Sequence, residues 1–174
     1  RIDYTNNPLI IAQNDNMVAI NSALEIDLTG QATSESIGDV FYSGVGGHQD
    51  FMRGALLARH GKPILAMKST AREDTISRIV PALKAQAGVT LNRSDVRYGI
   101  TEYGIAYLHG KNVRERAMSL IAIAHPKFRQ WLLYEAKDLR YISQDQELPP
   151  EGGSLYPGWM SWAYTLPAFP TRRA

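Results

Sequence analysis

Cysteine is absent from the sequence, and its absence excludes disulfide bonds, thiolate zinc sites and a cysteine nucleophile. Histidine is scarce as well. The four histidines stand singly along the chain, without the spacing that metal ligands need. We therefore expect no bound metal, and the lack of disulfides favours a cytoplasmic location.

Long apolar runs and a strong charge of one sign are missing too. No stretch approaches the roughly 20 apolar residues that cross a bilayer, so we expect no membrane partner. The formal net charge of +2 is too small to indicate a nucleic-acid-binding surface. The chain begins at Arg1 inside a segment that looks like the middle of a structured protein, and we interpret it as a piece of a longer one.

What the sequence does contain is typical of a folded domain, with 44% apolar and 21% charged residues. Apolar residues recur at helical intervals over 48–60, 112–124 and 127–139. Strand-like runs occur at 17–21, 23–30, 40–44 and 64–67, with shorter ones at 76–80, 88–91 and 96–101. This alternation predicts an α/β domain over residues 1–140, with a mixed, largely parallel sheet flanked by helices.

The last part of the chain, residues 141–174, is dense in proline, glycine and aromatic residues and has no sustained period. Such a composition is typical of a linker or of an arm laid over a partner surface. We therefore predict an irregular C-terminal arm.

Three glycines in four positions, Gly44 to Gly47, precede the helix expected from His48. Glycine lets backbone amides approach a ligand, and a helix start adds unpaired N–H groups and partial positive charge. The pattern is neither the nucleoside-triphosphate phosphate loop nor the dinucleotide fingerprint. From the residues alone, an oxyanion or phosphate cradle and a tight structural turn both stay open.

A second polar segment follows the strand expected at 64–67 and contains Lys68, Ser69, Thr70 and Arg72. Open α/β sheets bind ligands at the carboxyl ends of their strands, which favours a functional role for this segment. A solvated polar loop is the structural alternative.

Carboxylates and amides supply further candidates. Glu102 stands near the end of a predicted strand, ahead of a glycine and an expected helix. A carboxylate there could act as a base or nucleophile, or it could cap backbone N–H groups. We favour the capping role. Glu25 and Asp27 share one face of a strand, and we interpret that face as solvated. Asn6, ahead of Asn7 and Pro8, could present its amide to a developing negative charge or could mark a turn.

Several segments in one order carry a resemblance: "NNP", "NSALEIDLTGQ", "YSGVGGHQDF", "STAR", "TEYGIAYLHGK" and "IAHPKFR". From about Tyr4 to about Arg140 the chain resembles the C-terminal domain of the acetyl-CoA hydrolase/transferase family, which includes 4-hydroxybutyrate and succinate:acetate CoA-transferases. The resemblance implies two α/β domains that bind acyl-CoA between them. It also implies a glutamate that attacks the thioester, an acyl-glutamyl anhydride, a glutamyl-CoA thioester, and a carboxylate acceptor or water that completes the cycle.

The resemblance assigns roles to individual residues. Asn6 matches an asparagine that helps to form the oxyanion hole, and Gly47 matches a glycine whose backbone N–H faces the thioester or CoA. Arg72 stands where relatives often have a lysine that approaches a CoA phosphate. The CoA-binding residues implied in this way are Ser43, Gly44, Gly46, Gly47 and Arg72.

The same resemblance puts the nucleophilic glutamate before Arg1, so neither Glu25 nor Glu102 is assigned that role and the chain alone is expected to be inactive. Relatives commonly differ at His48, Arg97 and Gly99, which puts substrate choice rather than fold in doubt. We expect His48 to face solvent rather than the acyl group.

The sequence thus predicts the C-terminal half of an acyl-CoA hydrolase or CoA-transferase. The alternatives are a non-catalytic CoA-sensing module that regulates a fused acetyltransferase, and an interaction domain that no longer binds CoA. Expected partners are acyl-CoA with a carboxylate acceptor or water, and the N-terminal domain of the same protein. A following GNAT-type acetyltransferase domain is a further expected partner, because "YISQDQELPPEGGSLYP" resembles the segment that leads to one; a homodimer stays open.

Overall fold

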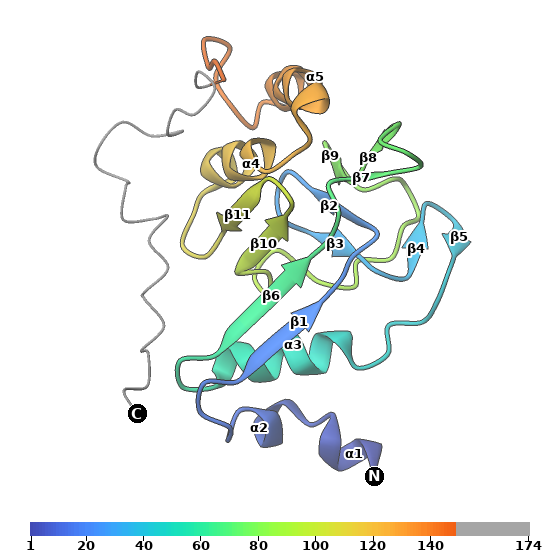
Figure 1. The fold of residues 1–174 in the computed structure, drawn as a ribbon, viewed down its shortest axis with the longest axis vertical. Coiled ribbons are helices and arrows are strands. Elements are labelled where there is room, and N and C mark those ends of the chain that lie inside the picture. Colours follow the sequence, from blue (N-terminus) through green and yellow to red (C-terminus); the bar gives the residue numbers. More distant parts are fainter. Residues whose placement is uncertain (149–174) are drawn as a thin grey trace.

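A computed structural model describes residues 1–148 of the chain (Figure 1). Its main sheet has the strand order β1-β6-β10-β11, in which β1, β6 and β10 run parallel and β11 is antiparallel to β10. The four strands are β1 (Val18–Asn21), β6 (Lys62–Ala66), β10 (Tyr98–Thr101) and β11 (Gly104–Tyr107). The predicted mixed, largely parallel sheet is therefore confirmed.

Helices pack on one face of this sheet. α3 (His48–Leu57) lies on the chain between β1 and β6 and contacts both, and α4 (Val113–Ala122) contacts β11 (Figure 1). Strand residues on this face, such as Ala19, Leu65 and Ala106, are buried in the core. Because side chains alternate along a strand, the neighbouring residues point to the other face.

The other face of the main sheet is apolar but partly open. Val18 and Ile20 of β1 are 45% and 66% exposed, and Ile64, Ile100 and Ile105 of the next strands are only half-buried. Parallel sheets are normally covered on both faces, and their strands are apolar on both. The strand sequences therefore suit a sheet with a second covering layer.

A second sheet, of three strands, explains an error of sequence reasoning. Its order is β3-β2-β9, with β2 in the middle, and the strands are β2 (Glu25–Asp27), β3 (Ala32–Thr33) and β9 (Ile79–Val80). Glu25 and Asp27 are both buried, so the expectation of a solvated face was wrong. The reason is that β2 is the central strand of its sheet and is buried at all three positions, so neither of its faces is exposed to solvent.

The remaining helices have local causes in the sequence. Asn7 caps α2 (Pro8–Ile11), Asn112 and Glu115 form a capping box at α4, and His125 caps α5 (Pro126–Asp138). The three helices predicted from periodicity are confirmed as α3, α4 and α5, with ends that differ by a few residues. α1 (Ile2–Thr5), which is as short as α2, has no buried residue.

Short strands account for most other differences from the sequence prediction. Residues 76–80 divide into two strands that join different sheets, and 88–91 make only an isolated bridge from Leu91 to Ala32. Gly104, with a φ of 144°, turns the chain after Glu102 into β11 rather than into the expected helix. The two hairpins are β4 (Ser36–Ile37) with β5 (Val40–Phe41) and β7 (Thr70–Ala71) with β8 (Ile76–Ser77).

The predicted C-terminal arm is described only at its start. Residues 141–148 form turns without helix or strand, and the rest of the arm, residues 149–174, lies outside the described residues.

Candidate functional site

The fold brings Asn6 and Gly47 into contact. Asn6 follows the last residue of α1, and Gly47 is the residue before α3. A methyl group built on the Cα of Gly47 would overlap Nδ2 of Asn6 and would lie 3.3 Å from its Cγ. The hydroxyl of Thr5 donates to Asn6 Oδ1 at 3.1 Å, which leaves Nδ2 on the side of Gly47.

The backbone N–H of Gly47 has no hydrogen-bond partner within residues 1–148. It stands at the N-terminus of a ten-residue helix and beside the amide of Asn6. Two N–H donors that lie together at the positive end of a helix can stabilise a developing oxyanion.

The glycine turn itself is accessible, since Ser43, Gly44 and Gly46 are all exposed. Gly46 has a φ of 52°, a conformation that favours glycine, and a side chain at Gly47 would displace the amide of Asn6. Gly44 has open space around it. The structure therefore favours glycine at two of the three positions.

A cleft of about 460 Å³ opens at the carboxyl ends of the parallel strands. Residues from the end of β10 and from the segments after β1 and β6 line it, together with one arginine: Ser22, Met67, Lys68, Arg78, Thr101 and Glu102. Lys68, from the polar segment after residues 64–67, and Glu102 therefore line the same cleft, and a functional role for that segment stays a prediction.

A short chain of hydrogen bonds joins this cleft to the glycine turn. The hydroxyl of Ser34 donates to the carbonyl of Ser22 at 2.9 Å, on the rim of the cleft. The hydroxyl of Ser43, in the glycine turn, donates to the carbonyl of Ser34 at 3.4 Å. The turn and the cleft are thus parts of one connected region.

Glu102 is held by the segment that follows β6. Its Oε2 accepts the backbone N–H of Ser69 at 2.9 Å and its Oε1 accepts the Ser69 hydroxyl at 2.7 Å. Desolvation raises the pKa of Glu102, but the hydrogen bonds from Ser69 outweigh it and leave that pKa below its ordinary value. The expected capping role is confirmed, and an engaged carboxylate of this kind is a poor nucleophile.

Arg78, another residue of the cleft, is also held by hydrogen bonds. Its Nε donates to the carbonyl of Leu24 at 2.9 Å, and the guanidinium also donates to the carbonyl of Ala23. Sequence reasoning missed Arg78 and Ser22. Ser22 follows a predicted strand and could have been found by the strand-end argument, whereas Arg78 reaches the cleft only because β9 pairs with β2.

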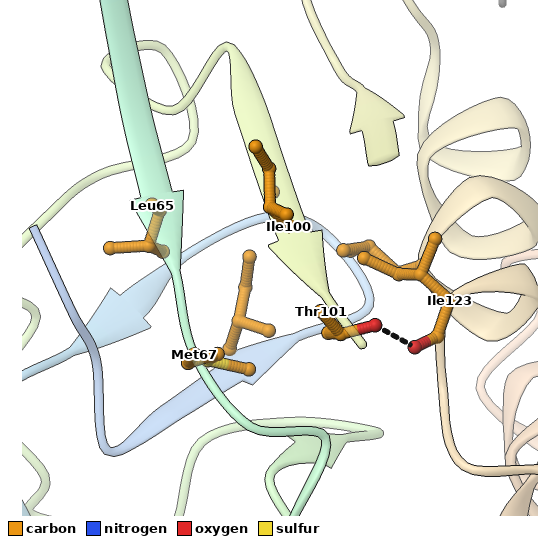
Figure 2. A pocket seen from close by; sticks show the side chains of 8 residues that line it. Leu65, Met67, Ile100, Thr101 and Ile123 are labelled. Carbon is orange, nitrogen blue, oxygen red and sulfur yellow. Dashed lines mark hydrogen bonds between the residues drawn. The ribbon is translucent and has the colours of Figure 1, made fainter. Parts of the chain in front are cut away.

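A smaller apolar pocket lies beneath the cleft, between the main sheet and α4 (Figure 2). Met67, Ile100 and Thr101 line both cavities, and the Thr101 hydroxyl donates to the carbonyl of Ile123 at 2.6 Å, as Figure 2 shows. A methyl group on Gly99 would lie 3.7 Å from Leu120 and 3.8 Å from Ile123, which are ordinary contact distances. Packing therefore does not require glycine at this position.

Arg72 lies apart from the glycine turn. It occupies the turn of the β7–β8 hairpin, with a φ of 48°, and it is exposed. In Figure 1 this hairpin and the glycine turn lie on opposite sides of the β4–β5 hairpin. Arg72 is thus separate from the contact between Asn6 and Gly47.

His48 corrects another expectation. Its Nε2 is buried and has no hydrogen-bond partner among the described residues, so the imidazole does not simply face solvent. Burial lowers the pKa of His48, which favours the neutral ring. Arg97 is also half-buried, and its Nε has no hydrogen-bond partner within residues 1–148.

Residues 1–148 lack two kinds of feature. No helix there is both long and apolar enough to pass through a membrane. No group of three or more histidine and acidic residues in the same part of the chain could hold a metal ion.

The family model for the acetyl-CoA hydrolase/transferase C-terminal domain matches residues 1–136. The chain is 56% identical over 136 residues to a 4-hydroxybutyrate coenzyme A transferase of Clostridium kluyveri, an alignment that covers 78% of this chain and 32% of that protein. It is 53% identical over 140 residues to a succinyl-CoA:acetate/propanoyl-CoA:succinate CoA transferase of Fasciola hepatica, covering 79% and 29%.

A solved structure is similar as well. The crystal structure of RipA from Yersinia pestis matches with a TM-score of 0.76 and 46% identity, over 81% of this chain and 32% of that one. The chain thus spans about a third of the length of the relatives that it matches.

Proposed function

The chain belongs to the acetyl-CoA hydrolase/transferase family, whose C-terminal domain it contains, and from that premise we propose a role for it in acyl-CoA chemistry. It supplies the oxyanion-stabilising and CoA-binding groups of an acyl-CoA hydrolase or CoA-transferase. Its substrates are acyl-CoA and a carboxylate acceptor or water, and it works in the cytoplasm.

The contact between Asn6 and Gly47 carries this proposal. When a thioester carbonyl is attacked, negative charge develops on its oxygen. The Nδ2 of Asn6 and the unpartnered N–H of Gly47 lie side by side, and both are donors. Donors aimed at such an oxygen lower the barrier because the charge exists only in the transition state.

The CoA contacts follow from the same turn. Ser43, Gly44 and Gly46 are exposed beside Gly47 and present backbone groups to the thioester end of CoA. Arg72, exposed on its hairpin, reaches a CoA phosphate at a distance from the reacting carbon. The strand-end cleft then receives the acyl group or the acceptor acid.

The attacking glutamate comes from elsewhere in a longer polypeptide. Glu102 is engaged by Ser69, and Glu25 is buried in the second sheet, so both are unsuited to attack. The partly open apolar face of the main sheet suits a covering layer from the rest of that polypeptide. The isolated chain is inactive for this reason.

The test is Asn6→Ala in a full-length protein that contains this domain. Loss of one oxyanion donor costs on the order of 3 kcal/mol in the barrier, so kcat should fall about a hundredfold while the fold persists. Asn6 is only partly buried, and circular dichroism would verify that the variant folds. An unchanged kcat would remove Asn6 from the mechanism.

A further inference from the structure

Lys68 is the free cation of the strand-end cleft. It directly follows Met67 beyond β6, it is exposed, and it lines the cleft. Its ammonium makes no hydrogen bond or ion pair with any residue in the described part of the chain. A cation on the wall of a cleft is free to bind an anion that enters it.

The other charges of the cleft are already engaged. Both oxygens of Glu102 accept hydrogen bonds from Ser69, and the guanidinium of Arg78 donates to two backbone carbonyls. Two cations and one carboxylate line the cleft, which leaves a net positive charge. An anionic group is therefore favoured there.

One acidic group outside the cleft also lies within electrostatic reach of Lys68. Asp74 on the β7–β8 hairpin accepts a hydrogen bond from the Thr70 hydroxyl. His125 and Lys127 act on the same carboxylate. Because Asp74 is shared among these groups and exposed, it does not neutralise Lys68 alone.

Apolar side chains of Ala66, Met67 and Ile100 make up much of the rest of the cleft wall, beside the small polar residues Ser22 and Thr101. Ala66 and Ile100 project from β6 and β10 on the open face of the sheet, and Met67 lies between the cleft and the apolar pocket beneath it. An aliphatic chain of a few carbons can lie against these side chains while a charged end meets Lys68. The combination suits a short aliphatic carboxylate.

We propose that Lys68 is a specificity-determining residue that selects substrates with a carboxylate at the far end of a short aliphatic chain. This inference rests on the proposed function. The carboxylate belongs either to a dicarboxylic acyl group on CoA or to a free acceptor acid. In both cases the ammonium forms a charge-assisted hydrogen bond that an uncharged methyl end cannot form.

Succinyl-CoA and butyryl-CoA are matched probes, because each has a four-carbon acyl group and they differ at the far end, carboxylate against methyl. Calorimetric titration of a full-length protein that contains this domain should show about tenfold tighter binding of succinyl-CoA. Lys68→Ala should reduce that ratio to near one. Lys127→Ala is the control, since Lys127 also faces Asp74 but does not line the cleft, and it should keep the ratio.

A second arm separates the two sources of carboxylate. Free succinate and butyrate are titrated in the same way, and a Lys68-dependent preference for free succinate alone would assign the site to the acceptor. Equal binding of the two CoA esters together with equal binding of the two acids overturns the role of Lys68 and leaves the proposed function standing. Failure of both CoA esters and of CoA itself to bind overturns the proposed function, and this inference with it.

Discussion

The side-chain amide of Asn6 lies so close to the Cα of Gly47 that no other residue fits at position 47 without displacing it. The two residues come from different parts of the chain, one from the end of α1 and one from the start of α3. Contact between α2 and α3 holds those segments together. The pair is therefore a product of the fold, and it can be disturbed from either side.

Gly47→Ala should disturb the pair without unfolding the domain. The added methyl group would overlap Asn6 Nδ2, and the partly exposed amide would move away. We expect kcat of a full-length protein that contains this domain to fall about a hundredfold, as for loss of one oxyanion donor. Gly44→Ala is the comparison, because a methyl group there meets open space and leaves the backbone groups in place, and it should lower kcat far less than Gly47→Ala. Full activity of the Gly47 variant would mean that the spacing of the pair is unimportant.

Gly54→Ala tests the contact that holds the pair in place. A methyl group at Gly54, inside α3, would overlap Ile11 of α2 and lie 3.3 Å from the carbonyl of Pro8. Overpacking of this kind should lower the free energy of unfolding by about 2 kcal/mol, measured by urea titration.

Gly99→Ala is the matched comparison, because its added methyl group meets only ordinary contacts. It should leave the stability unchanged or raise it by up to about 1 kcal/mol. Equal effects of Gly54→Ala and Gly99→Ala would show that α2 moves freely on α3.

Glu25 and Asp27 on the same strand should respond differently to substitution. Oε2 of Glu25 is buried and has no hydrogen-bond partner within residues 1–148. Desolvation, opposed by Lys84 and Arg78, raises the pKa of this carboxyl. A raised carboxyl pKa means that the folded state holds the proton more tightly. The protonated Glu25 carboxyl stabilises the folded state fully when the pH is below the ordinary glutamate pKa of about 4.3. This stabilisation is lost as the pH rises through the pKa of Glu25 in the folded state.

The free energy of unfolding should therefore fall between acid and neutral pH in part because Glu25 ionises. Glu25→Gln should remove this part of the fall, measured by urea titration at several pH values.

Asp27→Asn should instead destabilise the domain by about 1–2 kcal/mol at pH 7. Its carboxylate accepts from Thr29 and from both the backbone and the side chain of Gln31. A wild-type stability profile that Glu25→Gln leaves unaltered would contradict the burial argument.

Local signals in the sequence predicted much of this fold. The helical periodicity of residues 48–60, 112–124 and 127–139 was enough to find α3, α4 and α5, and the apolar runs found β1 and β6. Burial of Glu25 and Asp27 was missed. Their strand, β2, is buried because it lies between β3 and β9, and these two strands are too short to show a pattern in the sequence.

The site was predictable to a smaller degree. The resemblance named Asn6 and Gly47, and their contact agrees with a shared role that stays a prediction. The strand-end rule brought Lys68 and Glu102 to one edge. Arg78 could not be foreseen, because its position depends on the pairing of β9 with β2, and neither could the buried Nε2 of His48, because helix periodicity does not reveal packing around a helix start.

The central claim is that this domain supports a glutamate held elsewhere in a longer protein. Peptide mass spectrometry of the full-length protein after incubation with acyl-CoA tests it most directly. If the domain works in this way, a CoA adduct forms on a glutamate outside residues 1–174, and Asn6→Ala strongly reduces it. No adduct in a catalytically active protein, or an adduct on Glu25 or Glu102, would show that the domain does not work in this way.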